Sequence, residues 1–154
     1  MGIKFFLFLT LSFSYSVSAE QISIMSYNLN NLFDAQDDPG KDDKAYLPIA
    51  LKNNDDHIMG CLQVKNSKWR NECLFLDWNE EVVQKKISNI SDLLISMSES
   101  QPDIIAIQEI ENLNVLRMLF KKIEALGYTD FALIEGEDYR GIDNAIISKY
   151  PIYG

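Results

Sequence analysis

Histidine and cysteine are scarce in this chain of 154 residues, which has one histidine and two cysteines. With two thiols and a single histidine, a metal site made of cysteine alone is not expected. Basic residues are also few, because 14 Lys and Arg stand against 23 Asp and Glu and give a formal net charge of −9. This balance opposes non-specific binding to polyanions. A phosphate-ester substrate would therefore need a bound metal ion and local cations to overcome the repulsion.

Apolar runs long enough to cross a membrane are also missing. The apolar run from Phe5 to Val17 has thirteen residues, fewer than the roughly 20 that a spanning helix needs. It follows Lys4 and leads to a small residue, Ala19, which is the layout of a secretory signal peptide. We predict a signal peptide over residues 1–19 and a domain over residues 20–154. The domain is then secreted or periplasmic, of bacterial type, with no stable membrane insertion after cleavage.

Both cysteines, Cys61 and Cys73, lie in the predicted exported domain, so we expect a disulfide between them. Closing so short a loop contributes on the order of 3 kcal/mol or less, mainly by restricting the unfolded chain. The pair would fix the middle of a long polar insert, residues 34–77, which is expected to be either functional or disordered.

Apolar periodicity predicts the regular elements. A helix is expected over residues 79–98, because apolar residues recur at spacings of three and four: Val83, Ile87, Ile90, Leu94 and Met97. A second helix is expected between a cap at Asn112 or Asn114 and Gly127. Strands are predicted over 22–27, 104–108, 129–134 and 142–148. The order strand, helix, strand, helix, strand, strand predicts an α/β layered domain.

Two of the predicted strands end on polar side chains. The first leads to Asn28, and the second leads to Gln108 and Glu109. Such strands can deliver an amide and a carboxylate to one edge of a sheet. Mg²⁺ prefers oxygen ligands, takes one or two carboxylates and keeps waters or substrate phosphates in its other positions. The pattern therefore predicts a magnesium site and phosphate-ester chemistry.

Five phrases, taken in order, resemble the endonuclease/exonuclease/phosphatase superfamily of metal-dependent phosphoesterases: Ser26-Tyr27-Asn28-Leu29, Asn31-Leu32-Phe33-Asp34, Asp103 to Glu109, Arg140-Gly141-Ile142-Asp143 and Ile146-Ile147-Ser148. The resemblance runs from about residue 22 to 152. It implies a four-layer α/β sandwich, of which this chain would supply the N-terminal half: one mixed β-sheet with helices on its outer face.

The resemblance also implies roles for the two polar strand ends. Glu109 would be a direct ligand of Mg²⁺ or Mn²⁺, and Asn28 would sit at the same metal and orient its bound water or the phosphate. Plainer interpretations stay open. Asn28 is also an ordinary turn residue at a strand end, and Glu109 or Glu111 would offer negative charge ahead of the next helix N-terminus.

Two further residues lie where the resemblance implies contact with the substrate. Tyr139 would hydrogen-bond the substrate phosphate, and its neighbour Arg140 would clamp a phosphate oxygen with its two-pronged guanidinium. The alternative is that both are solvated turn side chains beside Glu137 and Asp138.

The family pattern includes a histidine–aspartate pair and a Gly-Asp-x-Asn phrase that are missing here. The single histidine, His57, lies in the insert and is interpreted as a surface residue. The missing C-terminal half is then needed to complete the site, and this chain alone is expected to be inactive.

The sequence thus predicts divalent-metal-dependent hydrolysis of phosphodiester bonds by an exported nuclease with a nucleic-acid substrate. A phosphatase or a phospholipid-headgroup diesterase is the alternative within the same fold. A secreted, non-catalytic binding module is the alternative outside enzymes.

Overall fold

The protein is described by a computed structural model over residues 21–153; the predicted signal peptide lies outside these residues. The fold is α/β, as expected from the order of the elements. The strands are β1 (Ile24–Leu32), β2 (Ile104–Ile110), β3 (Asp130–Ile134) and β4 (Asp143–Ser148). The helices are α1 (Asp55–Leu62), α2 (Ser67–Phe75), α3 (Glu80–Ser96) and α4 (Leu113–Ile123).

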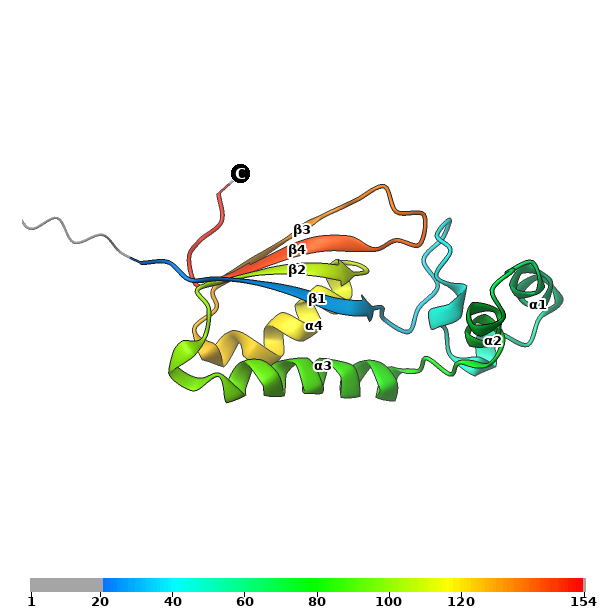
Figure 1. The fold of residues 1–154 in the computed structure, drawn as a ribbon, viewed down its shortest axis with the longest axis horizontal. Helices are drawn as coiled ribbons and strands as arrows, with labels where there is room; N and C mark the ends of the chain where they lie inside the picture. Colours follow the sequence, from blue (N-terminus) through cyan, green and yellow to red (C-terminus); the bar gives the residue numbers. More distant parts are fainter. Residues whose placement is uncertain (1–20, 154) are drawn as a thin grey trace, which may run out of the picture.

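The four strands form one mixed sheet in the order β1-β2-β4-β3. β1 and β2 run parallel, as a strand–helix–strand connection requires, whereas β4 is antiparallel to both of its neighbours. Helices α3 and α4 lie side by side on one face of this sheet (Figure 1). The prediction of a mixed sheet with helices on one face is therefore confirmed.

The hydrophobic core lies between the sheet and these two helices. Alternate residues of the central strands point into it, among them Ile105 and Ile107 of β2 and Ile147 of β4, all at most 2 % exposed. They meet the apolar stripe of α3 that the sequence predicted, of which Val83 and Ile87 are fully buried. The 3–4 spacing in the helix and the period of two in the strands thus serve the same core.

The opposite face of the sheet is not covered by any helix of the described residues (Figure 1). The register places its side chains in rows across the sheet, one of which joins Asn28, Gln108 and Asn144. Ile24 is 68 % exposed on this face. The rows mix small, polar and apolar side chains, and their polar end coincides with the C-terminal ends of β1 and β2.

The helix ends follow the expected signals. Asn112, one of the two predicted caps, accepts hydrogen bonds from the backbone N–H groups of Asn114 and Val115. Gly127 closes the short turn after α4 with a left-handed φ of +90°. The cap at Asn112 fixes where α4 begins, and it therefore helps to set the position of the end of β2.

The insert of residues 34–77, which the sequence predicted to be either functional or disordered, has regular secondary structure. It is ordered and contains α1, α2 and two 3-10 turns, Lys44–Tyr46 and Ile49–Leu51. The disulfide between Cys61 and Cys73 is present, with the two Cα atoms 5.6 Å apart, and it joins α1 to α2. The helical pair lies beyond the end of β1 (Figure 1). Among residues 21–153, no helix is long and apolar enough to cross a membrane.

Two neighbouring isoleucines of β2 test which face of the sheet is buried. Ile105 is 1 % exposed on the helix-covered face, whereas Ile104 lies on the open face. Ile105→Ala is expected to lower the free energy of unfolding by roughly 2–5 kcal/mol, because it removes buried methyl groups and leaves a cavity. Ile104→Ala should cost about 1 kcal/mol or less. Urea denaturation measures both, and equal losses would contradict the assignment.

Candidate divalent-metal site

Asn28 and Glu109 meet where β1 and β2 depart from regular pairing. Asn28 lies opposite Gln108, and pairing of the two strands resumes only where Leu32 meets Ile110. β2 shows a matching irregularity against β4, between Gln108 and Ile110. A β-bulge of this kind re-aims a side chain. Here it turns the carboxylate of Glu109 toward β1, where it meets Asn28.

The backbone at this point is left-handed at three residues that are not glycine. The φ angles are +52° at Asn30, +62° at Asn31 and +60° at Glu109. Asparagine tolerates this region better than most residues, whereas glutamate rarely adopts it. Such conformations cost of order 1–3 kcal/mol each and are concentrated at functional sites. The strained backbone at Glu109 is therefore a reason to consider this end of the sheet as a candidate site.

Two donors from β1 hold the Glu109 carboxylate. The side-chain Nδ2 of Asn28 donates to Oε1 at 2.9 Å, and the backbone N–H of Asn31 donates to Oε2 at 3.0 Å. Asn28 is itself oriented, because its Oδ1 accepts a hydrogen bond from the N–H of Asn30 at 2.7 Å. The structure therefore brings together the two residues that the sequence singled out, and each oxygen of Glu109 keeps a further lone pair.

Lys86 of α3 holds the left-handed turn at Asn30 and Asn31 from the helix-covered face of the sheet. Its Nζ donates to the carbonyl oxygens of Asn30, at 2.6 Å, and Asn31, at 2.9 Å. It also lies 5.2 Å from the centre of the Trp78 ring. Burial lowers the pKa of Lys86 to about 8, while the negative charge of Glu109 acts in the opposite direction. Sequence reasoning missed this residue, because only the fold brings it beneath the turn.

Glu109 is one oxygen ligand of the kind that a hard divalent cation takes. It offers one carboxylate in a held orientation, and Mg²⁺ commonly takes one or two carboxylates from a protein and fills its shell with water or phosphate oxygens. Asn28 donates its Nδ2 to Glu109, and its amide oxygen is neutral and already accepts one hydrogen bond from Asn30, so Asn28 fits the part of an orienting group better than that of a direct ligand. Glu109 is therefore the residue that would hold the ion, and Asn28 would hold Glu109.

A group of buried acidic residues lies just after Glu109 in the sequence and in the loop after β1. Asp34, Asp43 and Glu111 are at most 3 % exposed, and the N–H of Asp34 donates to Glu111 at 2.7 Å. The amide of Asn112 donates to Asp34 and Glu111, both at 3.2 Å. Among residues 21–153, no three of these carboxylates bring their oxygens within 4.8 Å of one another. The hydrogen bonds of Asp34 to Glu111 and Asn112 connect the loop after β1 to the end of β2.

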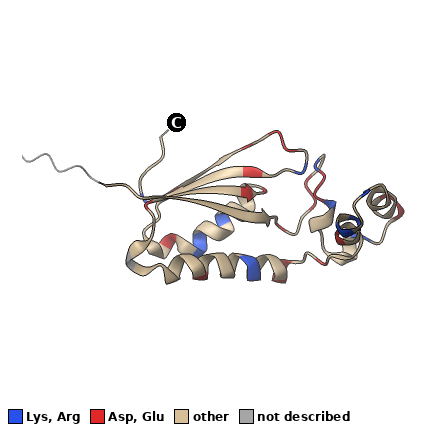
Figure 2. Ribbon diagram, viewed as in Figure 1, with Lys and Arg blue, Asp and Glu red and all other residues tan. Residues whose placement is uncertain are grey.

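Burial is the main cause of unusual protonation in this acidic group. It raises the pKa of Glu111 to about 9 and that of Asp43 to about 6. Glu111 is therefore neutral at pH 7. Acidic residues nonetheless gather at this end of the sheet, in the loop after β1, at the end of β2 and at the start of β4 (Figure 2). Their charge favours a cation there and opposes a free anion.

Tyr139 and Arg140 lie in the β3–β4 loop, at the same end of the sheet as Asn28. Tyr139 is 69 % exposed, and its carbonyl oxygen accepts a hydrogen bond from the N–H of Asp42. The guanidinium of Arg140 pairs with both carboxylate oxygens of Asp138, at 3.1 and 2.9 Å, which raises the pKa of Arg140. Arg140 is thus already engaged by a carboxylate, and a phosphate would have to compete with Asp138.

His57 is not at this site, and it is not the free surface residue that the sequence suggested. It is half-buried on α1, where its Nε2 lies 3.2 Å from Sγ of Cys61. The chain therefore has no histidine that could serve as a base beside Glu109.

No protein-family model matches the chain, and no curated protein and no solved structure shows significant similarity to it.

Replacing Lys86 should loosen the turn that holds Glu109. In Lys86→Met the carbonyls of Asn30 and Asn31 lose their common donor, so the backbone amide of Asn31 should exchange its hydrogen at least about ten times faster. Lys85→Met is the matched control, because Lys85 is its exposed neighbour on α3. Site-resolved hydrogen exchange measures the effect, and an unchanged rate for Asn31 would show that Lys86 does not support the turn.

Asp43 should make stability depend on pH. Its pKa is raised from 3.8 in the unfolded chain to about 6 in the fold. The folded state therefore binds the proton more tightly, and this contribution to stability is lost as the pH rises from about 4 to about 6. Asp43→Asn should remove this pH dependence and stabilise the chain at pH 7 by on the order of 1–3 kcal/mol. Thermal melts from pH 3.5 to 7.5 measure it, with the exposed Asp42→Asn as control. A decline in Asp43→Asn as steep as that of the unchanged chain, or steeper, would contradict the assignment.

Proposed function

We propose that this chain carries the metal-binding half of a divalent-metal-dependent phosphodiester hydrolase of the endonuclease/exonuclease/phosphatase type. The observation that supports the proposal is the held carboxylate of Glu109, at the C-terminal end of a central strand. It combines strained backbone, two donors from the neighbouring strand and an acidic surrounding that favours a cation.

In the proposed reaction the residues of the site bind and orient. Glu109 would hold the divalent ion, which when bound offsets the negative charge that develops on the phosphoryl oxygens. Asn28 would keep the carboxylate in place through its Nδ2. Lys86 and the N–H of Asn31 would keep the turn from relaxing. Tyr139, exposed on the β3–β4 loop, would donate to a phosphate oxygen, and Arg140 would exchange Asp138 for the phosphate.

The same proposal leaves this chain without a base to activate water. His57 is held at the disulfide, so a base would have to come from a part of the enzyme that the described residues do not supply. In the proposed four-layer arrangement a second sheet covers the open face, where Gln108 and Asn144 lie. We therefore propose that the chain alone binds the ion and does not turn over substrate.

A nucleic acid is the substrate we favour, acted on outside the cytoplasm. The disulfide is consistent with an oxidising compartment, and the predicted signal peptide would direct the chain there. A phosphatase or a phospholipid-headgroup diesterase would use the same ion site. The position of His57 favours one further candidate, a secreted binding module that keeps the ion site without catalysis.

Metal binding by the whole chain tests the proposal. Titration with Mn²⁺, followed by the loss of its free electron paramagnetic signal, should show one site. Glu109→Gln removes the charge and keeps only one of the two oxygens that accept hydrogen bonds from Asn28 and Asn31, so it should weaken binding at least about tenfold. Glu124→Gln, at the far end of α4, is the matched control and should bind as the unchanged chain does.

Hydrolysis is then assayed with plasmid DNA and with a bis-aryl phosphodiester in the presence of Mn²⁺. No turnover is expected from this chain. Turnover that disappears in Glu109→Gln would support the ion site and contradict the inactivity of the chain alone. Mn²⁺ binding that is equal in Glu109→Gln and the unchanged chain would overturn the proposed function.

A further inference from the structure

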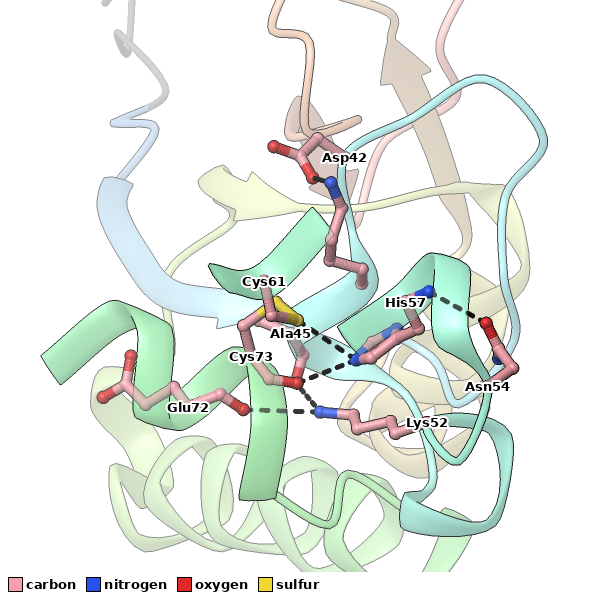
Figure 3. The surroundings of a disulfide bond; sticks show 9 residues. Asp42, Ala45, Lys52, Asn54, His57, Cys61, Glu72 and Cys73 are labelled. Atoms are coloured by element: carbon pink, nitrogen blue, oxygen red, sulfur yellow. Dashed lines mark hydrogen bonds and ion pairs between the residues drawn. A yellow bond between two sulfur atoms is a disulfide. The ribbon is translucent and has the colours of Figure 1, made fainter. Parts of the chain in front are cut away.

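Three side chains of the insert that can bind a metal ion converge at the disulfide. His57 and Cys61 lie four residues apart on α1, so they share one face of the helix, and Cys73 comes from α2. Nε2 of His57 lies 3.2 Å from Sγ of Cys61 and 2.9 Å from the carbonyl oxygen of Cys73 (Figure 3). The two sulfurs and Nε2 all lie within 4.8 Å of one another. Within residues 21–153, no other trio of His, Cys, Asp or Glu reaches this proximity.

The donor set of this trio is one that zinc selects. Zn²⁺ binds cysteine sulfur at about 2.3 Å and histidine nitrogen at about 2.0–2.1 Å, in tetrahedral sites. Two cysteines and one histidine make a three-ligand site whose fourth position is left for water. The same donors suit Mg²⁺ poorly, because it prefers oxygen. The trio is therefore different in kind from the carboxylate site at Glu109.

The helices that carry the three ligands are positioned by contacts other than the disulfide. Asn54 caps α1 by accepting a hydrogen bond from the N–H of His57 at 2.8 Å, and Asn66 caps α2. The buried amine of Lys52 donates to the carbonyl oxygens of Ala45 at 2.9 Å and Glu72 at 3.4 Å (Figure 3). These contacts do not involve sulfur, so reduction of the disulfide does not itself break them.

We propose that, when the Cys61–Cys73 disulfide is reduced, His57, Cys61 and Cys73 form a site for Zn²⁺. The inference is independent of the proposed phosphodiesterase. Its consequence is that α1 and α2 are cross-linked in both redox states, by a covalent bond under oxidising conditions and by the ion under reducing ones.

The chemistry balances with a dithiol as the reductant. By thiol–disulfide exchange the sulfur–sulfur bond breaks, each cysteine sulfur gains one electron and one proton from the dithiol, and the dithiol becomes a disulfide. Zn²⁺ then displaces the two thiol protons into solvent, and Nε2 of His57 gives up its hydrogen bond to Cys73 to bind the ion. In this state the proton of the neutral imidazole is on Nδ1.

The test uses the whole chain in the Glu109→Gln background, so that the two proposed ion sites are kept apart. The disulfide is reduced with a trialkylphosphine, which avoids thiols that compete for Zn²⁺, and two free thiols per chain confirm the reduction. Co²⁺ is added as a spectroscopic probe and then displaced with Zn²⁺. We expect one ion per reduced chain, a sulfur-to-cobalt charge-transfer band, and no such band in the oxidised chain.

Variants decide whether all three ligands take part. His57→Asn should weaken Zn²⁺ binding at least about tenfold, because it removes the nitrogen ligand, and the Cys61→Ser, Cys73→Ser double variant should abolish it. Asp56→Asn, an exposed neighbour on α1, is the matched control and should not change the affinity. Circular dichroism should show that Zn²⁺ restores any helix lost on reduction in the Glu109→Gln background and in the Asp56→Asn control, but not in the double cysteine variant. Equal binding by His57→Asn, or no binding by the reduced chain, would overturn the proposal.

Discussion

Two hydrogen bonds hold the carboxylate of Glu109 against β1, and the geometry of the whole site depends on them. One comes from Asn28 and the other from the backbone of Asn31, which is left-handed. That turn is held in place by Lys86, on a helix whose own position is set by the packing of its apolar stripe on the sheet. The chain of contacts therefore runs from core packing, through one lysine, to a carboxylate at the surface. Strain in the backbone is kept because the core is rigid.

Charge and burial divide the neighbouring acidic residues into two kinds. Glu111 and Asp43 are buried with raised pKa values, and Glu111 is neutral at pH 7, so it contributes hydrogen bonds rather than charge. Glu109 is only partly buried at the sheet edge, where an ion could reach it. Because Glu111 is neutral, acidic residues can pack together in the loop after β1, while the carboxylate of Glu109 stays accessible. The acidic side chains that remain charged at this surface oppose the binding of a free polyanion.

Much of the fold could be predicted because it follows apolar periodicity. The stripe from Val83 to Leu94 gave α3 within two residues at each end, and the run from Ile104 gave β2. The meeting of Asn28 and Glu109 followed from two strands ending on polar residues. The helices of the insert were missed, because α1 and α2 carry little apolar periodicity and are held by caps, a disulfide and the buried amine of Lys52.

Other features of the site could not be read from the sequence. Lys86 is one of several polar residues on α3. Only the packing of α3 against the sheet brings its amine to the carbonyl oxygens of Asn30 and Asn31. The bulge that aims Glu109 depends on the pairing of β2 with both of its neighbours. His57 is close to Cys61 in the sequence, and the one-turn spacing could have been noticed if the insert had been predicted as helical. Long-range contacts of this kind need the tertiary fold.

The position of a bound ion tests the central claim most directly. A crystal of the chain soaked in Mn²⁺ gives an anomalous signal that locates the ion without reference to activity. The account predicts a peak at coordination distance from the carboxylate of Glu109, with Asn28 still donating to that carboxylate. A peak elsewhere, with the Glu109 carboxylate bound only by protein donors, would contradict it.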